Sequence, residues 1–144
     1  MTLVDINDNL LNKARERITT SLQRVAKKKH AEDPAKGAAY VKDTLERIRW
    51  STQPTAAVAK SDLVIEAIVE NIEKKRELFS ALDKAAAEHT IFVSNTSSLP
   101  IGEIAVSTSR HDRFGGLHFF NPVPVMKLVE VIKVRVGIMR DGAC

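Results

Sequence analysis

This sequence of 144 residues has one cysteine, few aromatic residues and no long apolar stretch. Its single cysteine, Cys144, rules out a disulfide within the chain and suits a reducing compartment. No stretch approaches the roughly 18 uncharged apolar residues of a membrane span. Only 5% of the residues are aromatic, and the 22 basic residues are mixed with 18 acidic ones. A nucleic-acid surface is therefore poorly supported, and any anionic partner should be small.

What the sequence does contain is a regular alternation of short apolar runs and helical periodicity. Five runs have the composition of buried strands: residues 3–6, 63–68, 91–93, 114–120 and 126–132. Helices are predicted from Asn7 or Asp8 to Lys29, from Pro34 to about Ile48, around Phe79, and after Pro100. This alternation predicts an α/β fold with parallel strands joined by right-handed crossovers. No two histidines have metal-ligand spacing, so no metal site is predicted.

Asp5 stands at the carboxyl end of the first predicted strand, on the edge of a parallel sheet where ligands bind. Its carboxylate could accept hydrogen bonds from both hydroxyls of an adenosine ribose. It would also repel a 2′-phosphate, which would select NAD over NADP. A helix-capping aspartate is the alternative interpretation.

The glycine-rich loop that holds the phosphates of a dinucleotide should lie about 20 residues before such an acid. Only four residues precede Asp5, and no two of the six glycines form Gly-x-Gly. We therefore expect a sheet that is truncated at its first strand and that lacks this loop, whose backbone N–H groups bind the phosphates.

Two further groups of polar residues fall where predicted strands end. Ser94 to Ser98 are consecutive small polar residues, which either line a polar pocket or form a hydroxyl-rich turn before a helix. A turn over Asn121 to Pro124 would bring His118 beside Glu130. A carboxylate fixes the imidazole tautomer and stabilises the imidazolium, as a general base that takes a hydroxyl proton requires. A structural histidine is the alternative.

Four segments together resemble the L-3-hydroxyacyl-CoA dehydrogenases: residues 4–5, 66–71, 94–98 and 118–130. The resemblance extends from about Leu3 to Lys133 and is to the mitochondrial, short-chain, monofunctional form, with bacterial 3-hydroxybutyryl-CoA dehydrogenases as near relatives. It implies a Rossmann-type fold. It also implies an enzyme of fatty-acid β-oxidation that oxidises the 3-hydroxyl of an acyl-CoA to a ketone and passes hydride to NAD.

The resemblance assigns roles residue by residue. It implies that His118 is the base, that Glu130 is its orienting partner, and that Ser97 hydrogen-bonds the substrate oxygen near the nicotinamide. Asp5 is implied to hold the adenine ribose. The residues implied to line the cofactor are Glu70, Lys75, Ser97 and Asn121.

For CoA, the resemblance implies contacts from Ser97 and, on the first long helix, from Ser21 and Lys28. The helix itself supports the second pair, since residues seven apart are about two turns apart and share a face. The Lys28 ammonium could meet the CoA phosphates, while a solvated lysine run is the alternative.

The match to the family is incomplete at both ends. The first strand and the glycine loop are not recognised, nor is the C-terminal helical domain that forms the family's homodimer interface. We therefore predict a partial NAD-binding domain over residues 1–133 and a divergent tail over residues 134–144. The alternative function is a non-catalytic truncated isoform that binds CoA weakly or pairs with the full-length enzyme. The family implies the mitochondrial matrix, but no transit peptide is recognised, so a cytoplasmic location is the alternative.

Overall fold

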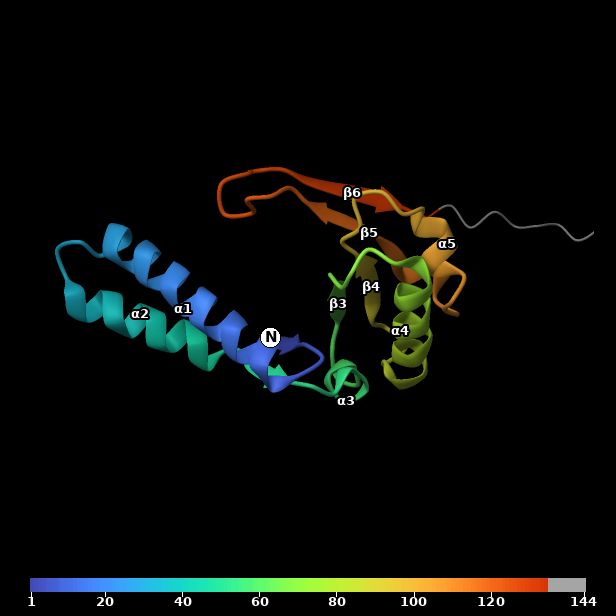
Figure 1. The fold of residues 1–144 in the computed structure, drawn as a ribbon, viewed down its shortest axis with the longest axis horizontal. Coiled ribbons are helices and arrows are strands. Elements are labelled where there is room, and N and C mark those ends of the chain that lie inside the picture. Colours follow the sequence, from blue (N-terminus) through green and yellow to red (C-terminus); the bar gives the residue numbers. More distant parts are fainter. Residues whose placement is uncertain (135–144) are drawn as a thin grey trace, which may run out of the picture. The chain divides into compact units, whose positions relative to one another are not determined.

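The computed structural model describes residues 1–134, which fall into two compact units, residues 1–57 and 58–134 (Figure 1). Both units contain parallel strands connected by helices, so the predicted α/β class is confirmed. The divergent tail predicted for residues 134–144 lies, except for Val134, outside the described residues. Within the described range, no helix is long and apolar enough to cross a membrane.

The first unit is a two-stranded parallel sheet whose crossover is a pair of helices. Its elements are, in chain order, β1 (Thr2–Val4), α1 (Asp8–Lys29), α2 (Pro34–Glu46), β2 (Arg49–Ser51) and, at the boundary with the second unit, α3 (Pro54–Val58). The two strands pair with Leu3 opposite Trp50. Figure 1 shows α1 and α2 lying side by side, which makes this crossover a helical hairpin.

Local sequence signals correctly predicted where these helices begin. The Asn7 side chain accepts a hydrogen bond from the backbone N–H of Leu10 (3.0 Å), which caps α1. Three lysines in the last turn of α1 suit the negative end of the helix dipole. Asp33 caps α2 by accepting from the backbone N–H of Lys36 (3.0 Å), and Pro34 fits the first turn.

Two short elements of this unit escaped prediction, and two boundaries moved. β2 is three residues long and α3 is five, too short to show an alternating or helical pattern. The first strand ends at Val4 instead of Ile6, because the chain must turn to reach the cap at Asn7. α2 ends at Glu46, so the last residues of the predicted helix lead into β2.

The second unit is built on a four-stranded sheet of order β3–β4–β5–β6. Its elements are β3 (Leu63–Glu66), α4 (Ile72–Ala85), β4 (Ile91–Ser94), α5 (Ile101–Ala105), a single 3₁₀ turn (His111–Arg113), β5 (Phe114–Phe119) and β6 (Val129–Lys133). β3, β4 and β5 are parallel, whereas β6 is antiparallel to β5. The predicted turn between the last two strands is confirmed: residues 120–128 are too few for a crossover of about a dozen residues, so β6 pairs antiparallel to β5.

One face of this sheet carries the core. Phe92 of β4 lies opposite Phe114 of β5, and the ring of Phe79 from α4 packs on both, at centroid distances of 5.5 and 4.7 Å. Ile104 of α5 is also fully buried against this cluster. On the other face, large apolar side chains are 41% to 69% exposed: Leu63, Ile65, Ile91, Val129 and Val131. The helices of the described chain therefore cover one side of the sheet.

Candidate active site

The β5–β6 hairpin places His118 directly opposite Glu130. His118 Nδ1 lies 3.4 Å from Glu130 Oε2. An ionised carboxylate can only accept, so Nδ1 carries the proton in this contact and Nε2 is left for another partner. The His118 side chain is 18% exposed and that of Glu130 is 55% exposed. The predicted juxtaposition is confirmed, and the antiparallel register is what produces it.

The hydroxyl-rich segment Ser94 to Ser98 follows β4 and is tied to its neighbours by its own side chains. The buried Ser94 hydroxyl donates to Glu66 Oε2 (2.5 Å), and the Thr96 hydroxyl donates to a Glu70 carboxylate oxygen. The Asn95 side-chain oxygen accepts from the backbone N–H of Phe119 (2.8 Å), which ties the segment to β5 beside His118. These bonds fit the hydroxyl-rich turn, because most of the polar groups stabilise the turn itself.

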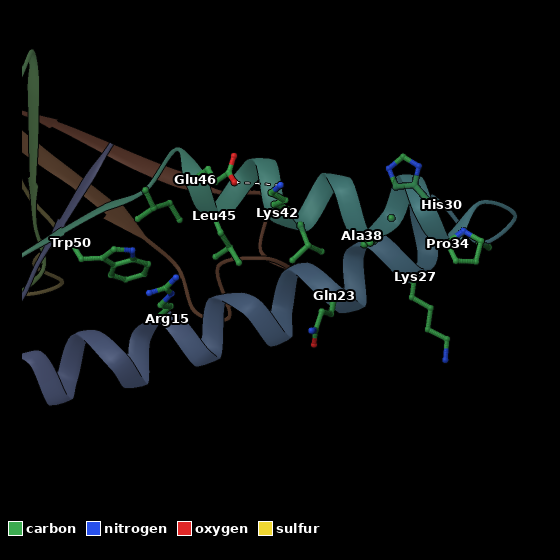
Figure 2. Close-up of a pocket in the computed structure, with 15 residues that line it drawn as sticks. Arg15, Gln23, Lys27, His30, Pro34, Ala38, Lys42, Leu45, Glu46 and Trp50 are labelled. Carbon is green, nitrogen blue, oxygen red and sulfur yellow. Dashed lines mark ion pairs between the residues drawn. The ribbon is translucent and has the colours of Figure 1, made fainter.

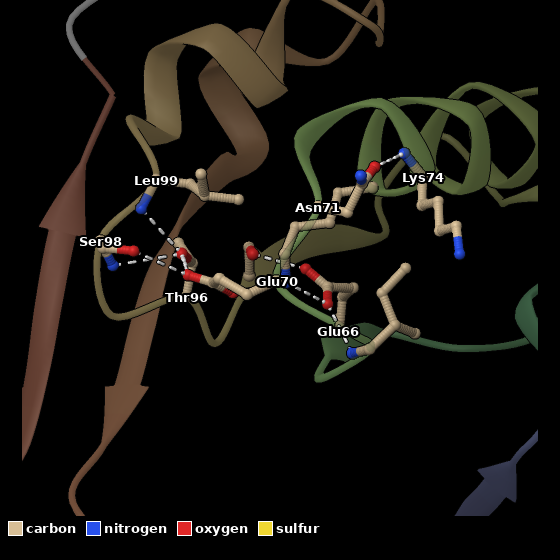
Figure 3. Close-up of polar contacts among 10 residues, drawn as sticks. Glu66, Glu70, Asn71, Lys74, Thr96, Ser98 and Leu99 are labelled. Carbon is tan, nitrogen blue, oxygen red and sulfur yellow. Dashed lines mark hydrogen bonds and ion pairs between the residues drawn. The ribbon is translucent and has the colours of Figure 1, made fainter.

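Ser97, the residue of this segment implied to touch substrate, is exposed at the bend. Its neighbours are held on both sides, since the Ser98 hydroxyl also donates to Glu70 (3.2 Å) and the Thr96 oxygen accepts from the Leu99 N–H (3.0 Å) (Figure 3). The segment thus presents Ser97 outward from a fixed turn.

A charged cluster supports this turn from β3 and α4. Lys75 Nζ lies 2.7 Å from Glu66 Oε1 and 3.4 Å from Glu70 Oε2. The Lys75 and Glu66 side chains are fully buried, whereas that of Glu70 is 39% exposed. The hydrogen bond from Thr96 and the charge of Lys75 hold the pKa of Glu70 below its usual value, although burial opposes them. Glu70 is therefore an ionised carboxylate at neutral pH, partly open to solvent.

Asn121 completes the predicted residues of this unit. It lies just after β5, on an exposed loop three residues beyond His118. The carboxyl ends of β3, β4 and β5 thus carry Glu70, Ser97 and Asn121, with Lys75 reaching the same end from α4.

Asp5 belongs to the first unit and directly follows β1. The helix-capping interpretation is wrong, because Asn7 caps α1. Asp5 instead accepts a hydrogen bond from the backbone N–H of Ile6 (2.7 Å), which turns its carboxylate at the strand end. A carboxylate at the carboxyl end of a parallel strand fits a ribose hydroxyl pair.

Ser21 and Lys28 are both exposed on α1. The buried Ala26 faces α2, where it approaches Gly37. At about 100° per residue, Ser21 and Lys28 lie roughly 140° and roughly 200° around the helix from Ala26. A groove of about 1020 Å³ between α1 and α2 is lined on the α1 side by Arg15, Gln23, Ala26, Lys27 and His30 (Figure 2). The predicted CoA face is therefore the outer side of α1, away from this groove.

Sequence patterns indicate no individual role for Glu66 or Thr96. In the structure Glu66 accepts from Ser94 and Thr96 donates to Glu70, and both bonds hold the turn. Glu66 has one signal in the sequence, a charged residue inside an otherwise apolar strand. Thr96 has none beyond its place among other hydroxyls. Among residues 1–134, no group of three or more His, Cys, Asp or Glu side chains could hold a metal ion.

Parallel strands with crossover helices, and polar groups gathered at the strands' carboxyl ends, define a Rossmann-type dinucleotide-binding domain. The sequence pattern described as "3-hydroxyacyl-CoA dehydrogenase, NAD binding domain" matches residues 1–136, and the chain belongs to this family. The predicted family, fold and cofactor NAD are thereby confirmed.

Individual relatives agree with this assignment. The mitochondrial hydroxyacyl-coenzyme A dehydrogenase of Homo sapiens is 59% identical over 133 residues, which are 92% of this chain and 42% of the human protein. A probable 3-hydroxybutyryl-CoA dehydrogenase of Bacillus subtilis is 52% identical over 110 residues, 74% of this chain and 38% of that protein. The crystal structure of (S)-3-hydroxybutyryl-CoA dehydrogenase from Ralstonia eutropha superimposes with a TM-score of 0.77 at 42% identity, over 90% of this chain and 44% of that one. The chain spans less than half the length of these relatives.

Proposed function

We propose that this chain is the cofactor-binding part of an NAD-dependent 3-hydroxyacyl-CoA dehydrogenase, which oxidises the 3-hydroxyl of an acyl-CoA to a ketone in fatty-acid oxidation. The observation that carries the proposal is the pairing of His118 with Glu130 across the β5–β6 hairpin. In this proposal residues 1–133 form the partial NAD-binding domain, and the tail from residue 134 takes no part in it.

The proton leaves the substrate's 3-hydroxyl for His118 Nε2, the ring nitrogen that does not face Glu130. The imidazolium that forms is stabilised by the Glu130 carboxylate, which also keeps the ring in the tautomer that can accept a proton. The Ser97 hydroxyl donates to the substrate oxygen and orients it. Bound NAD supplies the hydride acceptor, so the alcohol loses one hydride and one proton and becomes a ketone.

Cofactor and CoA are assigned to different residues of the chain. Asp5 holds the adenine ribose, supported by its place at the end of β1. On the second unit the cofactor is lined by Glu70, Ser97 and Asn121, and Lys75 acts on it through its ion pair with Glu70, because the Lys75 side chain itself is fully buried. The outer face of α1 takes CoA through Ser21 and Lys28, with Ser97 reached by the acyl part. Because the related human protein is named mitochondrial, we also propose a mitochondrial location for this one.

The test is to graft residues 1–133 in place of the matching segment of the human relative. The graft should reduce acetoacetyl-CoA with NADH, and His118→Gln should lower its kcat by at least about 10²-fold, the lower range for loss of a general base. His89→Gln is the matched control, since His89 is an exposed histidine of the same unit paired with Asp62 (3.2 Å). A His118→Gln graft that turns over like its parent would show the proposed base to be wrong.

A further inference from the structure

The proposed function gives no role to the buried charge of Glu66. This residue ends β3, and none of its side chain is exposed. Each carboxylate oxygen is nevertheless satisfied: Oε1 accepts from Lys75 Nζ (2.7 Å) and from the backbone N–H of Ile68 (2.7 Å), and Oε2 accepts from the Ser94 hydroxyl (2.5 Å). A buried carboxylate is costly unless it is bonded this completely, so the site is built around it.

Stability alone is a weak reason for such a group. A buried ion pair gains little over apolar side chains of similar volume, because desolvation offsets the attraction. Glu66 lies at the end of β3, where the polar residues gather, and Lys75 reaches it from α4. A charged pair at this place fixes the positions of its hydrogen-bond partners.

The Lys75 ammonium contacts both Glu66 and Glu70, and the two contacts differ in length. Lys75 lies closer to Glu66 (2.7 Å) than to Glu70 (3.4 Å). Lys75 faces Oε2 of Glu70, whereas Thr96 and Ser98, the two residues that flank Ser97, both donate to Oε1 (Figure 3). Because Glu66 takes the short contact with Lys75, the Glu70 carboxylate keeps the position in which Oε1 meets the two hydroxyls. With an uncharged residue at 66, the ammonium would move toward Glu70 Oε2 and draw the carboxylate away from those two hydroxyls.

We propose that Glu66 is a positioning residue of the cofactor site, which holds Lys75 in the longer contact with Glu70 Oε2 (3.4 Å) so that Glu70 Oε1 can fix the turn presenting Ser97. This inference rests on the proposed function, because it matters only if Ser97 and Glu70 meet the nicotinamide end of NAD. It assigns Glu66 no contact with cofactor or substrate. Its effect passes through Lys75 on one side and through Ser94 on the other.

The experiment is a nucleotide titration of the graft of residues 1–133 in the human relative, with the wild-type segment and with Glu66→Gln, followed by the amide resonances of Ser97 and Ser98. Two ligands are compared: NAD⁺, and ADP-ribose, which has the adenosine and the pyrophosphate but no nicotinamide. Glu66→Gln keeps the size of the side chain and removes its charge. We expect it to weaken NAD⁺ binding by about tenfold, the scale of one misplaced charge-assisted hydrogen bond, and to leave ADP-ribose binding within about twofold.

Leu82→Ala is the control for lost stability, because Leu82 is buried on the same helix as Lys75, two turns further from the turn at Ser97. Its NAD⁺ to ADP-ribose affinity ratio should equal that of the wild type. If Glu66→Gln does not fold, Ser94→Ala replaces it and should change the ratio in the same direction by a smaller factor.

The outcomes separate this inference from the proposed function. If Glu66→Gln leaves the ratio unchanged, or weakens both ligands equally, Glu66 is only structural and the inference is wrong, while the cofactor site stands. If the graft with the wild-type segment binds neither nucleotide, the proposed cofactor site is wrong and the inference falls with it.

Discussion

The two compact units bury their apolar side chains to very different extents. Within residues 58–134, eight buried hydrophobic residues form one cluster: Val58, Phe79, Leu82, Phe92, Ile101, Ile104, Ala105 and Phe114. Within residues 1–57, the buried hydrophobic residues are Leu11 and Ala26. The second unit is therefore held by a core, and the first mainly by helix caps, strand pairing and the contact of α1 with α2.

This difference parallels the proposed chemistry. The residues proposed to act on the substrate's hydroxyl lie on the unit with a core, where Glu66, Lys75 and His118 are buried or largely buried. The residues proposed to bind CoA lie on an exposed helix face. Precise placement of a reacting group needs rigid support, whereas a flexible phosphate chain can be met by a lysine on the surface.

The largest effect should come from Phe79→Ala, which removes the ring at the centre of the second core. We expect a loss of about 3–5 kcal/mol in the free energy of unfolding, against less for Leu11→Ala in the first unit. The lone tryptophan, Trp50, and the lone tyrosine both belong to the first unit, so fluorescence reports that unit and far-ultraviolet circular dichroism reports both. If Phe79→Ala lowers the unfolding midpoint seen by Trp50 fluorescence as much as the midpoint seen by circular dichroism, the two units unfold together. The contrast between their cores would then not hold.

The next effect should come from the ion pair between Asp83 and Arg110, which lies at the end of α4. Arg110 Nε donates to Asp83 Oδ1 (2.5 Å), and the same guanidinium donates to the backbone oxygens of Ala87 (2.8 Å) and Thr90 (3.2 Å). Burial by itself would raise the pKa of Asp83. The bonds from Arg110 and Ser109 outweigh it, so the pKa lies below its usual value.

Asp83→Asn should therefore cost about 2–3 kcal/mol at neutral pH. Because the folded-state pKa is lowered, the carboxylate stabilises the fold above the unfolded pKa of about 3.9, and this is lost as the pH falls through the folded value. In urea unfolding measured from pH 7 to pH 3, the difference in free energy of unfolding between variant and wild type should become smaller as the pH falls. Asp62→Asn is the control, since Asp62 is 95% exposed in its pair with His89. A difference that grows on acidification would contradict the assignment.

A smaller effect should come from Lys28→Ala in the graft with the human relative. Loss of one exposed phosphate contact should raise KM for acetoacetyl-CoA by about threefold to tenfold and leave kcat nearly unchanged, because the contact is the same in the ground and transition states. Lys27→Ala is the matched control, because Lys27 is the neighbouring lysine and lines the groove toward α2. Equal changes in KM for both variants would mean that CoA responds to the overall positive charge of the helix end and does not bind the outer face of α1 specifically.

The smallest effect should come from the helix caps, one in each unit. Asn7→Ala removes the acceptor for the N–H of Leu10, and Asn71→Ala removes the acceptor for the N–H of Lys74 (2.9 Å). Each should cost about 1 kcal/mol. Trp50 fluorescence should follow the first change and not the second. Equal responses to both would again argue for a single cooperative unit.

Much of the fold could be predicted because it depends on local signals. α1 follows from its apolar stripe and from the cap at Asn7, and β4 follows from its short apolar run. β2 could not be predicted, since Arg49 to Ser51 is a strand only because β1 lies beside it. The division into two units is likewise a property of tertiary contacts, which local patterns do not carry.

The candidate site divides in the same way. The pairing of His118 with Glu130 could be predicted from one turn between two strands. The support of Ser97 could not, because it joins three segments of the chain, those of Glu70, Lys75 and Thr96, and each bond depends on where the others lie. Burial of Lys75 is a further example, since a lysine at the start of a helix is usually solvated.

The register of the β5–β6 hairpin has a consequence for finding related sequences. His118 stands one residue before the end of β5, and Glu130 is the second residue of β6. The strands fix which residues oppose each other, so the loop between them can gain or lose residues without separating the pair. A search pattern for this site should therefore hold both strand ends constant and let the gap between histidine and glutamate vary, instead of requiring the spacing found in this chain.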